Sequence, residues 1–408
     1  MPPLSLNGLR PRCIGAGLSF LLLAACAGAD AADEWTGTVE TLPNGVVRVS
    51  NPPKGMWPEG RGWRLEPELA LGDEDGPEPF IFASISGVEA DAEGRIYVLD
   101  RESNTLKIFS PAGEHVRTVG REGGGPGEYR QANGLRWLSP DTLLVVDQRG
   151  ERYSILDKEG GFVRSVNRQL QFYGWMFSGD VVGDRVYEHA FVGHGTPELR
   201  PALQGIPLRA TDTLAARDTV PLAPPPGNPE DRTFVVRTKQ GGMTMSVPFA
   251  PGSVAVLDPT GHLWLGHGDA FRLVQTTLAG DTTREVILDA TPTPVSDQEL
   301  AEWEQGESVK EFRERGGHID MARIPKVKPF FEGVYPDPEG NLWVSIPAGP
   351  LETVFAVFDS GGRYLGRVQT AGFRRNRYIP PAARNGRLYL AGQDSLDVPK
   401  VYTFRVVK

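Results

Sequence analysis

The chain has 408 residues and a formal net charge of −9 at pH 7, with 39% hydrophobic and 23% charged residues. These proportions are typical of folded proteins and exclude a chain that is disordered throughout, while the acidic balance argues against a general nucleic-acid binder, which carries a basic surface. Its 49 glycines and 35 prolines, about a fifth of the chain, predict many turns.

The chain begins with a targeting segment. Arg10 and Arg12 precede an apolar run that ends in small residues near Ala25. This pattern is typical of a secretory signal peptide, and the run is too short to span a bilayer as a mature helix. We therefore expect residues 1–25 to be a removed signal peptide and residues 26–44 to be an acidic tether.

The end of the signal peptide, Leu-Ala-Ala-Cys at 23–26, resembles the bacterial lipobox. The resemblance implies cleavage before Cys26 and acylation of that residue, and two or three acyl chains hold a protein on a membrane where one does not. No Asp follows Cys26, which by resemblance to lipoprotein sorting favours the outer membrane. An ordinary signal peptide with a chance cysteine is the alternative. Cys13 lies in the removed segment, so the mature chain has no thiol left for a disulfide.

A unit of four β-rich runs recurs after the tether. Its clearest copy covers 87–120, with turn residues between runs of alternating apolar residues, which is the signal of antiparallel hairpins. A second copy follows from 134, and the distance from Asp100 to Asp147 gives a period of 47. Further copies begin at 253 and 333. A degenerate copy has its middle strand at 183–193 and outer strands near 206–213 and 216–223, and the last copy, at 384–407, keeps the middle two strands.

Six copies with a period of 40 to 50 residues predict an all-β fold, a six-bladed β-propeller of four-stranded antiparallel blades over residues 45–408. One such sheet cannot bury both faces, whereas sheets packed radially can. A closed ring needs a strand from the other terminus, and either 46–50 or 63–72 can supply it. Because 63–72 resembles the fourth strand of the blades, we expect it to complete the last blade.

The glycine-rich stretch at 120–129, GREGGGPGEY, follows the outer strand of the first copy. Its glycine spacing fits neither common nucleotide loop. We expect it to cross from the rim to the channel wall, where glycines permit positive φ. A nest of backbone amides that binds an anion beside Arg121 is the alternative.

One segment, about 295–317, breaks the β pattern. Ser296 and Glu299 have capping-box spacing, apolar residues recur on one side, and two glycines at 316–317 stop the run. The pattern predicts a helical insertion between the fourth and fifth blades. It either lids the channel or covers an edge.

The first copy resembles an NHL-type repeat, with a Gly turn, an aromatic strand that ends in Asp, an Asn, and a closing Gly. The matching residues are Gly94, Tyr97, Asp100, Asn104, Leu106, Phe109, Gly113 and Gly120. With Cys26 and the helical insertion, the whole chain resembles the bacterial six-bladed β-propeller lipoproteins. This resemblance is specific for the fold and says little about activity, because a propeller is a scaffold for many functions.

Similar-looking propellers include gluconolactonase-type lactonases and an amidating lyase of the NHL class, and both resemblances imply a divalent metal in the central channel. His189 and His267 fall near equivalent positions after strands of the third and fourth copies, so they are the candidate metal ligands. Two separate imidazoles, hydrogen-bonded or exposed, are the alternative. His194 and His318 are further histidines without an equivalent partner.

Other charged residues have simpler interpretations. Asp100 and Asp147 recur in register, which indicates Asx-type turns at strand ends. Glu332 could face the channel. The segment from Arg374 to Arg377 is the one basic patch, either a solvated loop or a site for an acidic ligand.

Two functional classes remain. The first and preferred class is a monomeric, lipid-anchored binding or protein-interaction scaffold without a cofactor, whose ligand is a peptide, a glycan or an envelope protein. The second is a divalent-metal-dependent hydrolase or lyase with its site in the channel. In both cases the anchor at Cys26 places the protein in the bacterial cell envelope, at the outer membrane facing the periplasm or the surface, with no nucleic-acid partner.

Overall fold

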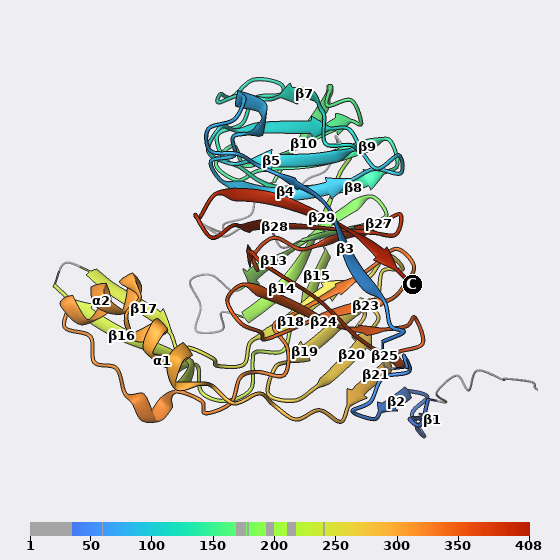
Figure 1. The fold of residues 1–408 in the computed structure, drawn as a ribbon, viewed down its shortest axis with the longest axis vertical. Coiled ribbons are helices and arrows are strands. Elements are labelled where there is room, and N and C mark those ends of the chain that lie inside the picture. The colour runs from blue at the N-terminus through green and yellow to red at the C-terminus, as the bar shows by residue number, and fades with distance from the viewer. Residues whose placement is uncertain are drawn as a thin grey trace, which may run out of the picture.

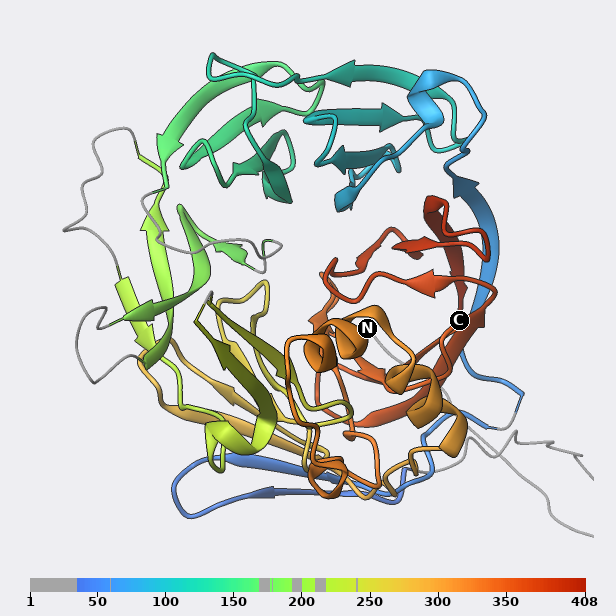
Figure 2. The ribbon, with the colours of Figure 1, turned by 90° about the vertical axis from the view of Figure 1, so that its left-hand side faces the viewer.

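The protein folds into a ring of six sheets around a central axis, seen along that axis in Figure 2 and from the side in Figure 1. The structure, a computed structural model, describes residues 35–408 except 59, 169–176, 178, 193–199, 210–217 and 240. Each sheet is one blade, with its first strand at the channel and its last strand at the rim. The predicted all-β, six-bladed β-propeller is confirmed.

The first three blades are four-stranded and antiparallel, with strands in chain order. Blade 1 consists of β4 (Ile85–Ala90), β5 (Ile96–Asp100), β6 (Thr105–Phe109) and β7 (His115–Val119). Blade 2 consists of β8 (Ala132–Ser139), β9 (Thr142–Asp147), β10 (Arg152–Asp157) and β11 (Phe162–Asn167). Blade 3 consists of β12 (Asp180–Val182), β13 (Arg185–Val192), β14 (Arg200–Pro207) and β15 (Asp218–Pro221). The third strand of blade 3 thus ends at Pro207, earlier in the chain than the run expected at 206–213.

The last three blades include strands from the N-terminal region. Blade 4 consists of β18 (Ser253–Leu257), β19 (Leu263–His267), β20 (Arg272–Thr276) and β21 (Thr282–Leu288), extended by β2 (Val47–Asn51) and β1 (Thr38–Thr41). Blade 5 consists of β22 (Gly333–Pro336), β23 (Leu342–Ile346), β24 (Glu352–Phe358) and β25 (Tyr364–Ala371). In blade 6, β26 (Arg374–Arg375) and β27 (Ala382–Arg384) both pair with β28 (Arg387–Gln393), followed by β29 (Pro399–Val407) and β3 (Arg64–Leu71).

The ring is closed by the strand expected to close it. β3 pairs antiparallel with β29, with Leu71 opposite Val401 and Arg64 opposite Val407, so the two ends of the folded chain meet in one sheet. The other candidate segment forms β2, which pairs in parallel with β21 at the rim of blade 4. Because β1 adds to β2, the folded part begins before the expected boundary at residue 45.

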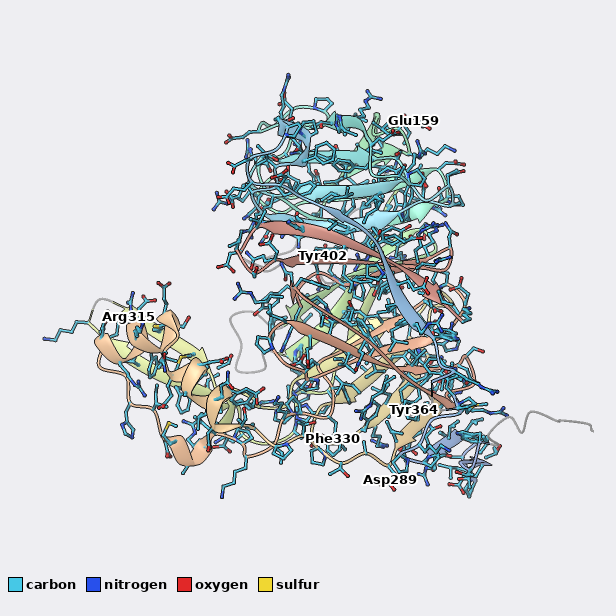
Figure 3. All side chains as sticks on the ribbon, viewed as in Figure 1. Glu159, Asp289, Arg315, Phe330, Tyr364 and Tyr402 are labelled. Atoms are coloured by element: carbon cyan, nitrogen blue, oxygen red, sulfur yellow. The ribbon has the colours of Figure 1, made fainter. Side chains whose placement is uncertain are left out.

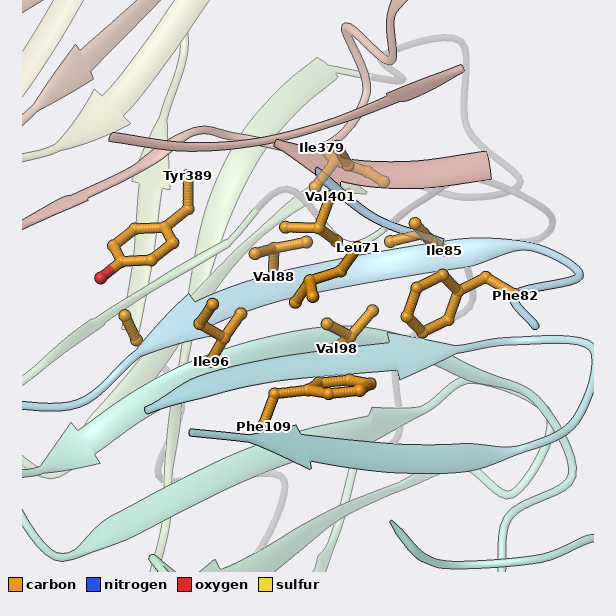
Figure 4. Packing of buried hydrophobic residues seen from close by; sticks show 12 residues of the cluster. Leu71, Phe82, Ile85, Val88, Ile96, Val98, Phe109, Ile379, Tyr389 and Val401 are labelled. Atoms are coloured by element: carbon orange, nitrogen blue, oxygen red, sulfur yellow. The ribbon is translucent and has the colours of Figure 1, made fainter. Parts of the chain in front are cut away.

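The core lies between the blades. All five residues of β5 are buried, because alternate side chains serve two different interfaces. Ile96 and Val98 pack toward blade 6, in the cluster that Figure 4 shows, whereas Tyr97 and Leu99 pack toward blade 2. Radial packing therefore covers both faces of each sheet, as the repeat pattern predicts.

The glycine-rich stretch at 120–129 connects the rim strand β7 to the channel strand β8, as expected. Gly120 and Gly127 have φ of 90° and 71°. The amide of Gly125 donates to Glu128 Oε2 at 2.7 Å, and Arg121 also bonds this carboxylate. The carboxylate of Glu128 therefore accepts hydrogen bonds that the alternative interpretation assigned to a bound anion.

The helical segment forms two helices, α1 (Asp297–Glu304) and α2 (Glu307–Glu314), instead of one, because Gly306 becomes the N-cap of α2. Ser296 and Glu299 form the expected capping box. The helices pack on a hairpin of β16 (Thr233–Thr238) and β17 (Gly241–Ser246). In the sequence this hairpin lies between blades 3 and 4. We call this hairpin and the two helices the inserted subdomain, and Figure 1 shows it projecting from one face of the ring.

The inserted subdomain has a small core of its own. Phe312 of α2 is fully buried against Phe234 of β16, with ring centroids 6.3 Å apart. Short 3-10 turns complete the chain: η1 (Glu78–Phe80), η3 (Pro229–Arg232) and η4 (Met321–Arg323). Neither α-helix found in the described residues has the length and apolar character needed to cross a bilayer.

Candidate functional site

The central channel forms a cavity of about 690 Å³ to which every blade contributes. Its charged lining comes from the inner strands of several blades: Glu89 from β4, Arg136 from β8, Asp180 from β12 and Arg384 from β27. None of these four residues lines the second cavity, which lies beside the inserted subdomain.

Arg136 bridges two carboxylates in the channel. Its Nη1 lies 3.3 Å from Glu89 Oε1, and its Nε lies 3.5 Å from Asp180 Oδ1. Burial raises the pKa of Glu89 to about 7, against the opposing effect of Arg136 and Arg384. Glu89 is therefore a carboxyl group that can exchange a proton near neutral pH.

A second ion pair lines the channel between blades 2 and 3. Arg168 donates through Nε and Nη2 to Glu188 Oε1 and Oε2, at 2.8 and 2.7 Å, and both residues are buried. The hydroxyl of Tyr153 also donates to Glu188. Because each of these charges is paired, this network serves packing between two blades.

A larger cavity, about 980 Å³, lies where the inserted subdomain meets the ring, and we call it the insertion-face cavity. Its wall includes Glu299 of α1 and the chain that returns from the subdomain to blade 5, near Phe330 in Figure 3. Its floor consists of strand ends from blades 5 and 6. Glu332, Arg377 and Tyr378 line both cavities, so the insertion-face cavity opens into the channel.

The wall of this cavity is held by a partly buried ion pair. Lys328 is 8% exposed and bonds Glu299, the same carboxylate that caps α1. Burial works against ionisation of Glu299, but hydrogen bonds from Lys328 and Ser296 outweigh it and lower the pKa of Glu299. The charge of Glu299 thus fixes both the start of α1 and its position over the ring.

The basic segment from Arg374 to Arg377 is divided between solvent and this cavity. Arg374 is exposed and pairs with Asp397, while Arg377 pairs with Glu332. Arg375 is only 9% exposed and points into blade 5, where its Nη2 donates to the Tyr335 hydroxyl at 2.7 Å. The solvated-loop interpretation therefore holds for part of the segment and not for Arg375.

Glu332, the acid expected to face the channel, lies where the two cavities join. Burial raises its pKa, and the charges of Arg377, Arg375 and Lys328 lower it in part. Its backbone N–H donates to the Ser345 carbonyl at 2.9 Å. Glu332 is thus a carboxylate surrounded by cations at the base of the insertion-face cavity.

The two candidate metal ligands have separate partners. His189 lines the channel, its Nε2 lies 3.0 Å from the Ala255 carbonyl oxygen, and burial lowers its pKa. The Nδ1 of His267 lies 3.0 Å from Ser253 Oγ.

Their positions in the blades are not equivalent. His189 is two residues beyond Tyr187, and His267 is three beyond the corresponding Trp264, so their side chains point to opposite faces of their sheets. Across the part of the chain that the structure describes, no three His, Cys, Asp or Glu side chains gather as a metal site. Metal binding stays a prediction, and Cys26 and His194 lie outside the described residues.

Asp100 and Asp147 act at strand ends, but they do more than form the expected Asx-type turns, because their carboxylates also bond a segment that lies earlier in the chain. Asp100 accepts backbone N–H bonds from Ala83 and Ser84 at 2.8 and 3.1 Å, and Asp147 accepts them from Arg130 and Gln131 at 3.1 and 2.9 Å. Each carboxylate therefore holds the connection that leads into the inner strand of its own blade.

A second recurring aspartate was missed by sequence reasoning. Asp258 accepts a bond from the indole of Trp264 at 3.1 Å, Asp337 from Trp343 at 3.0 Å, and Asp91 from the Tyr97 hydroxyl at 3.0 Å. Each Asp precedes its aromatic partner by six residues, and this recurring spacing could have predicted the three hydrogen bonds.

Comparison with known proteins gives the fold. Residues 76–163 match the model of the family DUF5128, which is described as a 6-bladed beta-propeller. No curated protein matches the sequence. A solved DUF4221 family member from Bacteroides vulgatus is similar at 12% identity over 85% of this chain and 99% of that chain, with a TM-score of 0.49.

Two enzymes are similar at the same low level. A gluconolactonase from Xanthomonas campestris has 12% identity over 80% of this chain and 87% of its own, with a TM-score of 0.40. Virginiamycin B lyase from Staphylococcus aureus has 11% identity over 83% and 88%, with a TM-score of 0.35. At these identities the names describe those proteins and not the chemistry of this one. The matched family model and the strand pairing together identify the chain as a six-bladed β-propeller.

Proposed function

We propose that the protein is a lipid-anchored binding propeller of the bacterial cell envelope and that its ligand occupies the insertion-face cavity. The observation that carries this proposal is the cavity itself, about 980 Å³, formed jointly by the ring and a subdomain inserted into it. Ligand pockets have roughly this size and occur where two structural units meet.

The lining of the cavity suits a ligand with both polar and apolar parts. It combines the charged groups of Lys328, Glu332 and Arg375 with apolar surface from Phe249 and Ile346. A few placed polar groups in a mostly apolar pocket fix the orientation of a ligand and exclude poorly matched ones. A short peptide or an oligosaccharide has the size and mixed polarity that this lining accepts.

Two singly labelled variants test where the ligand binds. The mature chain with Cys26→Ser has no other cysteine, so each variant carries one fluorescent label. Ala348→Cys places the label at the cavity, and Ala112→Cys, in a separate protein, places it on an exposed outer turn of blade 1. Titration with a panel of short peptides and soluble oligosaccharides should give a saturable change at position 348 and none at 112.

Two results would contradict the cavity assignment. One is a ligand whose binding, measured by calorimetry, leaves the label at position 348 unchanged. The other is a complete panel that gives no saturable binding. In both cases the insertion-face cavity is not the binding site of this propeller.

The anchor at Cys26 is the second part of the proposal. Thr38, the first residue of β1, is twelve positions after Cys26, and a fully extended chain over those twelve steps spans roughly 40 Å at most. Because β1 lies at the rim of blade 4, an acylated Cys26 tethers the ring by its side and leaves the insertion-face cavity open to the surrounding compartment.

Two cysteine variants test the anchor. Cys26→Ala should abolish incorporation of labelled palmitate and release the protein from the membrane fraction, because the acylated residue is lost. Cys13→Ala, within the signal peptide, is the matched control and should keep both properties. Membrane association of the Cys26→Ala protein at the wild-type level would refute the anchor.

A further inference from the structure

Arg384 of β27 differs in charge pairing from the other arginines of the central channel. The other three arginines that line this cavity each have a Glu or Asp within 4.0 Å: Arg136, Arg168 and Arg377. No described carboxylate lies that close to Arg384. It donates through Nη1 to the Ala90 carbonyl oxygen at 3.2 Å, and its guanidinium lies 5.8 Å from the centroid of the Trp137 ring. Uncharged groups thus hold this cation in place.

Arg384 has donors that a ligand in the channel can reach. The residue is half-buried, and the Ala90 carbonyl is the one described acceptor of its hydrogen bonds. None of its nitrogen atoms is both buried and without a partner, so Nε and Nη2 keep accessible surface. Arg384 lines the channel cavity and bonds the last residue of β4, the innermost strand of blade 1. Its accessible donors therefore belong to the channel.

The charged groups beside Arg384 are accessible as well. Arg136 bridges Glu89 and Asp180, and the charge of Arg384 acts on the ionisation of Glu89. The side chains of Glu89, Arg136 and Asp180 are 14, 17 and 35% exposed. We call these three residues and Arg384 the channel cluster. When both carboxylates are ionised, the two arginines balance them and the cluster has no net charge.

Glu89 decides the charge of the channel cluster near neutral pH, because burial raises its pKa to about 7. The charged groups that act on it come from three other blades: Arg136 of β8, Asp180 of β12 and Arg384 of β27. On the adjoining strands β5 and β28, Tyr97 and Tyr389 stay neutral because burial raises the pKa of both phenols, and β29 presents the apolar Val401. Protonation of Glu89 therefore leaves two arginines against one carboxylate.

We propose that the channel cluster binds the carboxylate of a small organic acid and that Glu89 takes up a proton from solvent as the acid binds. The ligand's carboxylate accepts from Nε and Nη2 of Arg384, and the protonated Glu89 no longer repels it. This site lies beyond the one proposed above for the insertion-face cavity, and neither depends on the other.

The charge balance favours a carboxylate over a phosphate. One negative charge cancels the excess positive charge of the protonated cluster, whereas the second charge of a phosphate would meet the ionised Asp180. The side of a guanidinium that carries Nε and an Nη also matches the two oxygens of a planar carboxylate. A sugar acid and the carboxyl end of a short peptide share this chemistry.

Calorimetry on the mature chain with Cys26→Ser tests the binding and its proton. D-galacturonate and N-acetylglycylglycine are the acids, and D-galactose and N-acetylglycylglycinamide are their neutral counterparts. At pH 6, at least one acid should bind at least tenfold more tightly than its counterpart, because only the acid pairs with Arg384. Which acid binds tells a sugar acid from a peptide carboxyl end, and inorganic phosphate should bind more weakly than the better acid.

The pH dependence has an expected size. The acids stay ionised from pH 6 to pH 8, so any proton taken up goes to the protein. The better acid should bind about tenfold more tightly at pH 6 than at pH 8, because the protonated fraction of Glu89 falls by about that factor. At pH 7, titrations in two buffers of different ionisation enthalpy should show uptake of about half a proton per ligand.

Variants assign the binding to the channel cluster. Arg384→Gln should weaken the acid at least tenfold at pH 6. Glu89→Gln should bind it equally well at pH 6 and pH 8 and take up no proton. Asp180→Asn should bind it more tightly than wild type at pH 8, since a negative charge is removed, and damage to the fold would not give this sign. Arg405→Gln is the matched control, because Arg405 pairs with Glu66 on the exposed outer strands β29 and β3.

Several outcomes would overturn the channel site. These are equal binding of acids and neutral counterparts, no binding of either acid, phosphate binding as tightly as the better acid, equal affinity at pH 6 and pH 8 in the wild type, or wild-type affinity in a folded Arg384→Gln. If Arg384→Gln does not fold, Glu89→Gln and Asp180→Asn still decide. An acid that changes the label at position 348 and binds Arg384→Gln normally removes the channel site and leaves the insertion-face cavity as the binding site.

Discussion

The channel and the insertion-face cavity are both lined by charged side chains, but the charges are paired differently. In the channel, Arg136 lies between Glu89 and Asp180, and Arg168 binds Glu188 through two hydrogen bonds. On the floor of the insertion-face cavity, Arg375 is also buried, at 9% exposed against 4% for Arg168, but no described carboxylate pairs with it. The charge of Arg168 is thus balanced by a neighbouring carboxylate, whereas the charge of Arg375 is not.

The difference separates a structural charge from one available to a ligand. A buried ion pair whose geometry is complete has already replaced its lost hydration, so a ligand gains little by approaching it. A buried cation held by hydroxyls and aromatic rings keeps most of its attraction for an anion. Removing a paired charge and removing an unpaired one should therefore change the free energy of unfolding by different amounts.

The largest expected effect is on the paired side. Arg168→Leu should lower the free energy of unfolding by about 3–5 kcal/mol, because Glu188 is left buried without its partner. Urea unfolding at pH 7 measures this. The double variant with Glu188→Leu is the control and should recover much of the loss, since apolar replacement of a whole buried pair is often neutral. A loss below about 1 kcal/mol in the single variant would mean that the pair is not structural.

The next effect concerns Glu89 and pH. Its folded-state pKa, about 7, lies above the ordinary value of 4.5, so the unfolded chain releases the proton first as pH rises. The stability that protonated Glu89 contributes is therefore complete below about pH 4.5 and is lost as pH rises through 7. Relative to Glu89→Gln, the wild-type free energy of unfolding should fall by up to about 3 kcal/mol between pH 4.5 and 8.

Paired unfolding curves at pH 5 and pH 8 check this sign. The informative quantity is the difference between wild type and Glu89→Gln, because other titrating groups cancel in it. A difference for Glu89→Gln that does not change with pH would show that the channel keeps Glu89 ionised.

A smaller effect is expected at the unpaired cation. Arg375→Met should change the free energy of unfolding by no more than about 1 kcal/mol, because the lost bonds to Tyr335 and Ser345 are offset by removal of a buried, unpaired charge. The same urea assay compares it with Arg168→Leu. A loss as large as that of Arg168→Leu would make Arg375 a structural residue and end the contrast between the two cavities.

The ring could be predicted from the sequence because its information is local and repeated. Alternating apolar residues, as in Ile96–Asp100, mark a strand with two buried faces, and six copies of such hairpins leave few folds other than a propeller. The closing strand was found because 63–72 resembles the strands it replaces. By contrast, β2 joins blade 4 by pairing in parallel with β21, which is distant in sequence, and no local pattern predicts such a partner.

The candidate site was harder to predict, because it depends on burial. The three arginines of the segment Arg374 to Arg377 look alike in the sequence. Only the pairing of β26 with β28 turns Arg375 toward Tyr335 and Phe355 and leaves its neighbours at the surface. The hairpin under the helices is a similar case, since Phe234 gains its role only when α2 packs on it. The cavity between ring and subdomain follows from those long-range contacts.

The smallest effect is expected within the same basic segment. Arg374 is next to Arg375 in sequence but exposed, and its partner Asp397 is also exposed. Water and salt screen such a pair, so Arg374→Gln should change the free energy of unfolding by less than about 0.5 kcal/mol. Urea unfolding in low and high salt, with Asp397→Asn as the partner variant, measures this.

A loss above about 1 kcal/mol for Arg374→Gln would change the interpretation of the whole segment. It would mean that the ion pair with Asp397 holds β26 in the register that buries Arg375. The distinction between the two arginines would then rest on strand position and not on burial alone. An unaffected variant leaves burial as the property that separates a surface charge from one that can bind a ligand.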